Sequence, residues 1–78
     1  MNKVKIFDVV ALTVDLSEDN LSRGQVGTVV EILANGSAFE VEFSDSQGQT
    51  YESLGLRPEQ FMVLHFEPSQ SETTTIHR

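Results

Sequence analysis

Residues 39–43 read Phe39-Glu40-Val41-Glu42-Phe43, so that apolar and acidic side chains alternate without a break. Successive side chains of a β-strand point to opposite faces of a sheet, and this alternation therefore predicts a strand with one buried face. The three apolar residues are expected in a core and the two glutamates in water. No stretch of the chain sustains apolar residues at the period of a helix. The sequence thus predicts an all-β fold.

Turn signals on both sides of this strand predict a meander of three strands. Asn35-Gly36 follows the β-rich run 27–33, and Asn-Gly between two such runs is typical of a tight hairpin turn. On the other side, residues 44–48 form a second turn, which leads to a strand over 49–54.

The two ends of the predicted domain add one strand each. The extended run 3–14 is predicted to carry the first strand, with a β-bulge at Phe7-Asp8, where the apolar alternation changes phase. Pro58 suits the first turn of a short 3-10 helix, and the last strand follows over 61–64.

A long polar loop over 15–25 separates the first strand from the meander. Leu16 and Leu21 within it are expected to close one end of the core, because large apolar loop residues are usually turned inward. Gly24 and Gly27 are expected to be hard to replace, either because φ is positive or because two strands approach closely there.

These elements predict a small five-stranded SH3-like barrel with one short 3-10 turn before the last strand, and an open meander is the alternative. The barrel is expected to span 1–66. Residues 67–78 are polar and are predicted to be a disordered tail, because they cannot bury enough apolar surface to offset the entropy of ordering. The predicted core comprises Val10, Leu12, Val30, Ile32, Phe39, Val41, Phe43, Tyr51, Leu56, Phe61 and Val63.

Composition argues against several classes of site. The chain has no cysteine, which removes disulfides, thiolate-bound zinc and cysteine nucleophiles. His65 and His77 both follow the last predicted strand, and no spacing resembles a metal site or a catalytic triad. We therefore expect no enzyme activity, no cofactor and no metal. The N-terminal apolar run is too short for a signal peptide or a membrane span, and a cytoplasmic location is expected.

The charge balance is the most informative bulk property. Twelve acidic against five basic side chains give a net charge of −7, and most of it belongs to the predicted domain. Nucleic acid and anionic membranes are poor partners for such a surface. A basic protein would be attracted to it. The alternative is that the acidity only keeps the protein soluble.

Two places gather the candidate partner-binding residues. One is the long loop, and the other is the outer face of the strand over 39–43, where flanking strands are expected to add Glu31 and Glu52. Paired carboxylates also serve glycoside hydrolysis, but a barrel this small offers little room for a cleft. The candidates are Asp15, Glu18, Asp19, Arg23, Glu40 and Glu42.

Several motifs resemble known families. Asp8 to Leu12 and, after the long loop, Arg23 to Ile32 resemble the opening half of many SH3-like barrels, among them KOW-type ribosomal and transcription modules and the SH3-like peripheral subunits of photosynthetic complexes. A closer resemblance covers 5–64, to a family of small bacterial proteins that is common in cyanobacteria and catalogued as a domain of unknown function. The features that carry it are Leu12-Thr13, the acidic loop that follows, Arg23 to Val30, Phe39 to Phe43, Tyr51 and Leu56 to Gln60.

That resemblance implies a function. Members of the family often sit beside a second small gene, in an arrangement that suggests a toxin with its neutralising partner. We therefore expect a non-catalytic, antitoxin-like domain that binds another, basic protein through an acidic surface. The alternative is an accessory structural subunit of a larger complex, such as a photosynthetic one. RNA binding of the KOW type is disfavoured by the acidic charge. The oligomeric state stays open.

Overall fold

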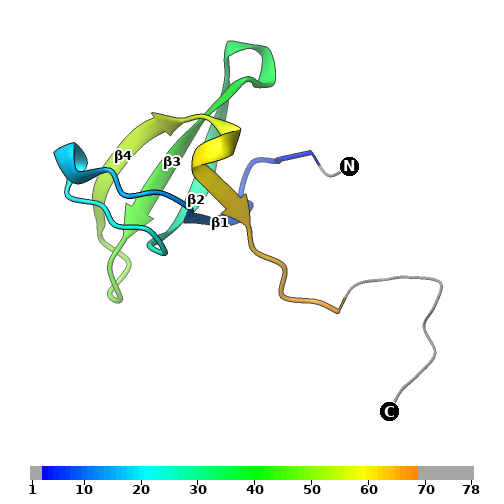
Figure 1. Ribbon diagram of the computed structural model, residues 1–78. Coiled ribbons are helices and arrows are strands. Elements are labelled where there is room, and N and C mark those ends of the chain that lie inside the picture. The colour runs from blue at the N-terminus through cyan, green and yellow to red at the C-terminus, as the bar shows by residue number, and fades with distance from the viewer. Residues whose placement is uncertain (1–2, 69–78) are drawn as a thin grey trace.

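The structure is a computed structural model that describes residues 3–68 (Figure 1). The described residues contain strands and short 3-10 turns but no α-helix, so the predicted all-β class is confirmed. The predicted tail lies, from residue 69 onward, outside the described residues. The strands are β1 (Val9–Leu12), β2 (Val26–Leu33), β3 (Ala38–Ser44), β4 (Thr50–Leu56) and β5 (Phe61–Val63), and the 3-10 turns are η1 (Ser17–Asp19), η2 (Ala34–Gly36) and η3 (Pro58–Gln60).

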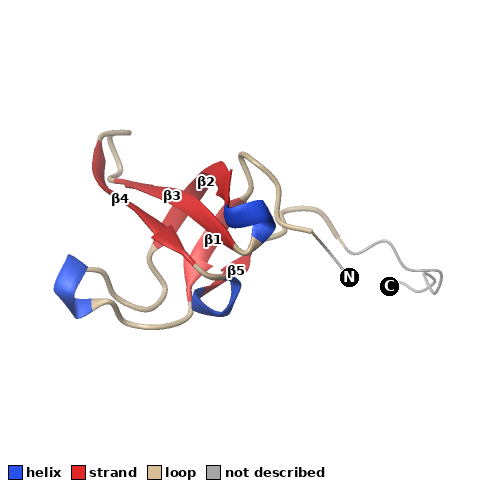
Figure 2. Ribbon diagram, turned by 90° about the horizontal axis from the view of Figure 1, so that it is seen from above, coloured by secondary structure: helices blue, strands red, loops and turns tan. Residues whose placement is uncertain are grey.

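The five strands form one antiparallel sheet in the order β4-β3-β2-β1-β5 (Figure 2). The meander of β2, β3 and β4 and the 3-10 turn before β5 are as predicted. The expected closure into a barrel is not observed, because no ladder joins the edge strands β4 and β5 in the part of the chain that the structure describes. Only Arg57 and the turn η3 link these strands, so the chain crosses the end of the sheet and does not run back along β4.

The core lies on one face of this sheet and is centred on β3. Val41 is fully buried between Phe39 and Phe43, as the alternation predicts. The rings of Phe39 and Phe61 meet edge to face, with centroids 5.8 Å apart, and this contact brings β5 over β3. The buried residues are Val10, Leu12, Leu21, Val29, Phe39, Val41, Phe43, Leu56 and Phe61.

The phase predicted for β2 is wrong because of a bulge. Val29 pairs with Val41 and Glu31 pairs with Glu40, so Val30 is an extra residue in the ladder. The buried residue is therefore Val29, and Val30 is half-buried. The predicted core residue Ile32 lies beyond the bulge, near the end of the strand, and is 45% exposed.

Two further residues of the predicted core, Tyr51 and Val63, are not fully buried. The ladder between β3 and β4 is irregular after Phe43, and Tyr51 is 47% exposed, with its hydroxyl accepting a hydrogen bond from Gln25 Nε2 at 2.7 Å. Val63 is half-buried. Leu21 is 2% exposed and Leu16 packs against the core, which confirms the prediction that these two loop leucines turn inward.

Two glycines have the constraints that the sequence suggested. Gly24 has a φ of 94°, in the left-handed region that suits glycine. Gly27 has an ordinary φ but lies against β3, where a Cβ would meet Val41 Cγ1 at 2.7 Å and the carbonyl oxygen of Glu42 at 2.8 Å. Close packing, and not dihedral freedom, thus requires the second glycine.

Candidate functional site

The outer face of the sheet, opposite the core, carries the carboxylates of β3. Glu40 and Glu42 alternate with the buried Phe39, Val41 and Phe43, and both are half-buried. Their positions on this face are therefore those expected from the sequence.

Neighbouring strands add further side chains to this face. Glu40 lies opposite Glu31 of β2 and Gly55 of β4, while Glu42 lies opposite Thr28 of β2 and Ser53 of β4. We call Glu31, Glu40 and Glu42 the acidic patch. Glu52, which was expected to join it, pairs with the buried Phe43, and its register therefore assigns it to the core side of β4.

The acidic patch contains an unfavourable pair. Glu31 and Glu40 are directly opposite in an antiparallel ladder, where like charges destabilise a sheet. Glu40 Oε2 accepts a hydrogen bond from Ser53 Oγ at 2.7 Å, but a neutral hydroxyl does not cancel its charge. The ion pair found within residues 3–68 joins Arg57 and Glu59, so no described cation neutralises the patch.

Exposed apolar side chains adjoin the acidic patch on the same face. Ala11 of β1 lies opposite both Val26 of β2 and Met62 of β5, so these three residues form a row across three strands. Val26 is 47% exposed and Met62 is 54% exposed. We call this set the apolar row. Thr28, two residues beyond Val26 on β2, lies opposite Glu42 and connects the apolar row with the acidic patch.

The loop candidates lie apart from this face. The loop projects to one side of the sheet, with η1 at its tip (Figures 1 and 2). Asp15 Oδ1 accepts a hydrogen bond from the Arg23 backbone N–H at 2.8 Å, so Asp15 closes the loop on itself. Glu18 and Asp19 belong to η1. No described hydrogen bond or ion pair brings these loop residues together with Glu40 or Glu42.

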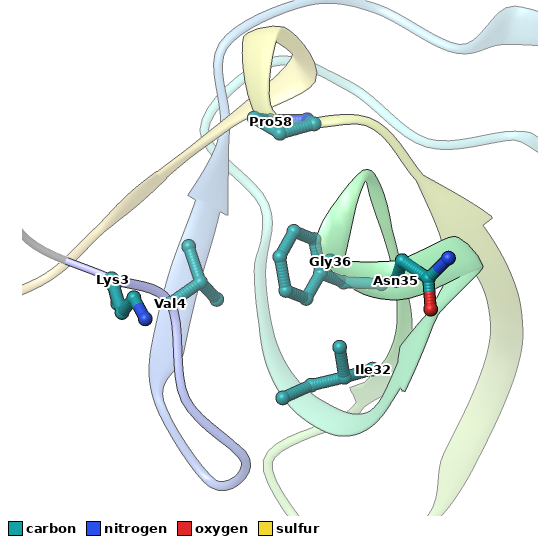
Figure 3. A pocket seen from close by; sticks show the side chains of 7 residues that line it. Lys3, Val4, Ile32, Asn35, Gly36 and Pro58 are labelled. Atoms are coloured by element: carbon teal, nitrogen blue, oxygen red, sulfur yellow. The ribbon is translucent and has the colours of Figure 1, made fainter.

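An open, mostly apolar pocket of about 490 Å³ lies between the N-terminal segment, the β2–β3 hairpin and η3 (Figure 3). Among the described residues, Lys3 is the one ionisable residue that lines it, so no acid–base pair of residues 3–68 faces this space. Its lining is Lys3, Val4, Ile32, Asn35, Gly36, Phe39 and Pro58.

Within the described residues, one carboxyl group has a clearly shifted pKa. Hydrogen bonding to the backbone and to the neighbouring Arg57 lowers the pKa of Glu59, whereas a general acid would need a raised one. Residues 3–68 contain no group of three or more acidic or histidine side chains placed to hold a metal ion. Over the same residues, no helix has the length and apolar character to cross a membrane.

The chain matches a known protein family. A family model described as "Domain of unknown function (DUF4926)" matches residues 6–63, a range that contains all five strands, the acidic patch and the apolar row. No curated protein and no solved structure matches the chain.

Proposed function

For this chain, which belongs to the DUF4926 family of domains of unknown function, we propose a non-catalytic role in which the acidic patch binds a basic protein. The observation that carries the proposal is the Glu31–Glu40 pair. Two carboxylates face each other across a ladder without a described cation, and like charges at such opposed positions lower the stability of a sheet. A lysine or arginine of a partner would remove that repulsion and gain two charge-assisted contacts.

The most concrete form of the proposal is a neutralising partner of a toxin that acts on nucleic acid. The active groove of such a toxin is basic because it binds phosphates. Carboxylates placed on a rigid strand offer oxygens where phosphates would bind, and a net charge of −7 steers the two proteins together. The absence of cysteine agrees with a reducing, cytoplasmic location, which is part of the proposal.

A second candidate is an accessory structural subunit of a larger complex. The open sheet favours it, because β4 is a seven-residue edge strand to which a neighbouring protein could add a strand. The adjacent gene distinguishes the two candidates. A small basic protein encoded there favours neutralisation, and an operon of complex subunits favours the accessory role.

Reversing the charges of β3 tests the surface. The double variant Glu40→Lys and Glu42→Lys is expected to slow association with the basic partner about 10- to 100-fold, with a smaller effect on dissociation, since steering charges act mainly on encounter. Surface plasmon resonance measures both rate constants. The matched control is Glu18→Lys with Asp19→Lys, which changes the net charge equally but alters η1. A larger effect of the control would assign binding to the loop instead.

A single substitution separates the stability of the patch from its function. Glu31→Lys places a cation opposite Glu40, and we expect it to stabilise the domain by about 0.2–1 kcal/mol while it weakens binding. Thermal unfolding and a binding titration are the two measurements. Glu31→Gln removes only the repulsion and should give a smaller rise in Tm. A lower Tm for both variants would show that Glu31 has a stabilising role within the fold.

A further inference from the structure

The segment before β1 holds a phenylalanine in a backbone position that suits glycine. Asp8 N–H donates to the Lys5 carbonyl at 3.0 Å, closing a turn in which Phe7 is the third residue, with a φ of 77°. Phe7 N–H donates to the Val29 carbonyl at 2.7 Å, and Val29 N–H donates to the Asp8 carbonyl at 2.9 Å. Phe7 and Asp8 together thus oppose Val29 alone, which confirms the β-bulge predicted at Phe7-Asp8. Phe7 occupies the first position of this bulge, where a glycine with a left-handed φ is usual.

Neither packing nor backbone geometry accounts for this phenylalanine. Its side chain is 77% exposed, so it contributes little to the core. A left-handed φ is a genuine outlier for a bulky residue and costs stability. The preceding residue of the turn, Ile6, is also 43% exposed. The turn therefore combines a strained backbone with two large apolar side chains in water.

The bulge lies beside the stretch of β2 that carries Glu31 of the acidic patch, because Phe7 and Asp8 pair with Val29, two residues before Glu31. Phe7 extends the pairing of β1 with β2 beyond Val9, which lies opposite Thr28. The same two strands carry Ala11 and Val26 of the apolar row, and β2 carries Glu31 of the acidic patch. The strained aromatic residue, the apolar row and the acidic patch thus lie along adjoining strands.

We propose that Phe7 is the apolar anchor of the interface with the basic partner, and that its ring enters an apolar pocket of that protein. The inference rests on the proposed function and adds the apolar part of the contact. Phenylalanine and methionine are enriched in the centres of protein interfaces, and one buried aromatic anchor often dominates the affinity. A basic protein is the occupant that fits, because its cations would meet Glu31 of the acidic patch, close to the bulge along β2, while its pocket takes the ring.

The test is the substitution Phe7→Gly in the full chain, since the proposal predicts opposite effects on stability and on binding. The partner is first isolated from the source cells with the tagged chain and then titrated as a purified protein. We expect Phe7→Gly to weaken its affinity about 30-fold or more while Tm rises by several degrees, because the left-handed strain is relieved. Phe7→Asn, which also tolerates this backbone region, should behave in the same way.

The matched control is Phe66→Gly, because Phe66 is 78% exposed but has no left-handed backbone. It should change neither affinity nor Tm. Unchanged affinity of Phe7→Gly for the partner overturns the inference, because the ring would then not contribute to binding. A lower Tm in both Phe7 variants also overturns it, because the ring would then stabilise the fold. Two other occupants of the Phe7 surface are tested in the same way, a membrane with phosphatidylglycerol vesicles and a second copy of the chain by sedimentation. The inference is overturned if the wild-type chain binds the vesicles or forms a dimer and Phe7→Gly abolishes that association.

The two proposals fail in different ways. If salt and the reversals at Glu40 and Glu42 weaken binding while Phe7→Gly does not, the anchor is wrong and the proposed function stands. If Phe7→Gly abolishes a binding that is indifferent to salt and to these reversals, the proposed function is wrong. If the wild-type chain retains no basic protein, both are overturned.

Discussion

The substitution Val41→Asp is expected to unfold the domain. Val41 is fully buried at the centre of β3, opposite Val29 of β2 and Leu54 of β4. An aspartate there would be an uncompensated charge, which costs on the order of several kcal/mol. A domain of this size, with no disulfide, typically has a reserve of only about 3–5 kcal/mol. Circular dichroism at 25 °C should therefore show an unfolded chain with no cooperative melt.

The control for this prediction is the same substitution at an exposed valine. Val26→Asp lies on the outer face of β2, and we expect it to change the stability by no more than about 1 kcal/mol. A cooperative melt of Val41→Asp near the wild-type Tm would contradict the phase of β3. In that case Glu40 and Glu42 would no longer be assigned to the outer face, and the acidic patch would be lost with it.

The second large effect is expected at Gly27. In Gly27→Ala the new Cβ would lie 2.8 Å from the carbonyl oxygen of Glu42, a backbone atom, so β2 and β3 would have to separate. Overpacking of this kind costs about 1–3 kcal/mol. Because 1 kcal/mol shifts Tm by about 4–8 °C in a domain of this length, the expected loss is readily measured in a thermal melt.

A second strand glycine provides the comparison. At Gly55 of β4 a Cβ would lie 3.6 Å from Leu33 Cδ1, an ordinary contact, and φ is not positive. Gly55→Ala should therefore leave Tm unchanged or raise it, since alanine loses less conformational freedom on folding. An equal loss of stability in both variants would mean that the approach of β2 to β3 at Gly27 is looser than the structure shows.

The sequence predicts those parts of the fold that depend on local pattern. The alternation over 39–43 correctly identifies both faces of β3, because β3 is regular over these residues. For β2 the same reasoning fails, since the bulge at Val30 reverses the alternation in the middle of the strand. Nothing local distinguishes Val29 from Val30. The bulge exists only in the pairing of β2 with β3, which is a long-range feature.

The candidate surface was predictable to a similar extent. Glu40 and Glu42 follow from the alternation, but the opposition of Glu31 to Glu40 depends on the same bulge. The apolar row requires the pairing of β1 with both β2 and β5, strands that are far apart in the sequence. A phase change at Phe7-Asp8 indicates a bulge, whereas the left-handed φ of Phe7 is visible only in the structure.

Electrostatic attraction between the acidic patch and a basic protein is the basis of the proposed function. The most direct test is the association rate constant of the purified partner between about 0.1 M and 1 M NaCl, over which the Debye length falls from about 10 Å to about 3 Å. We expect the association rate constant to fall at least about tenfold over this range, while the dissociation rate constant changes much less. An association rate constant that is the same at both salt concentrations would rule out electrostatic recruitment, and the carboxylates of the outer face would then serve only solubility.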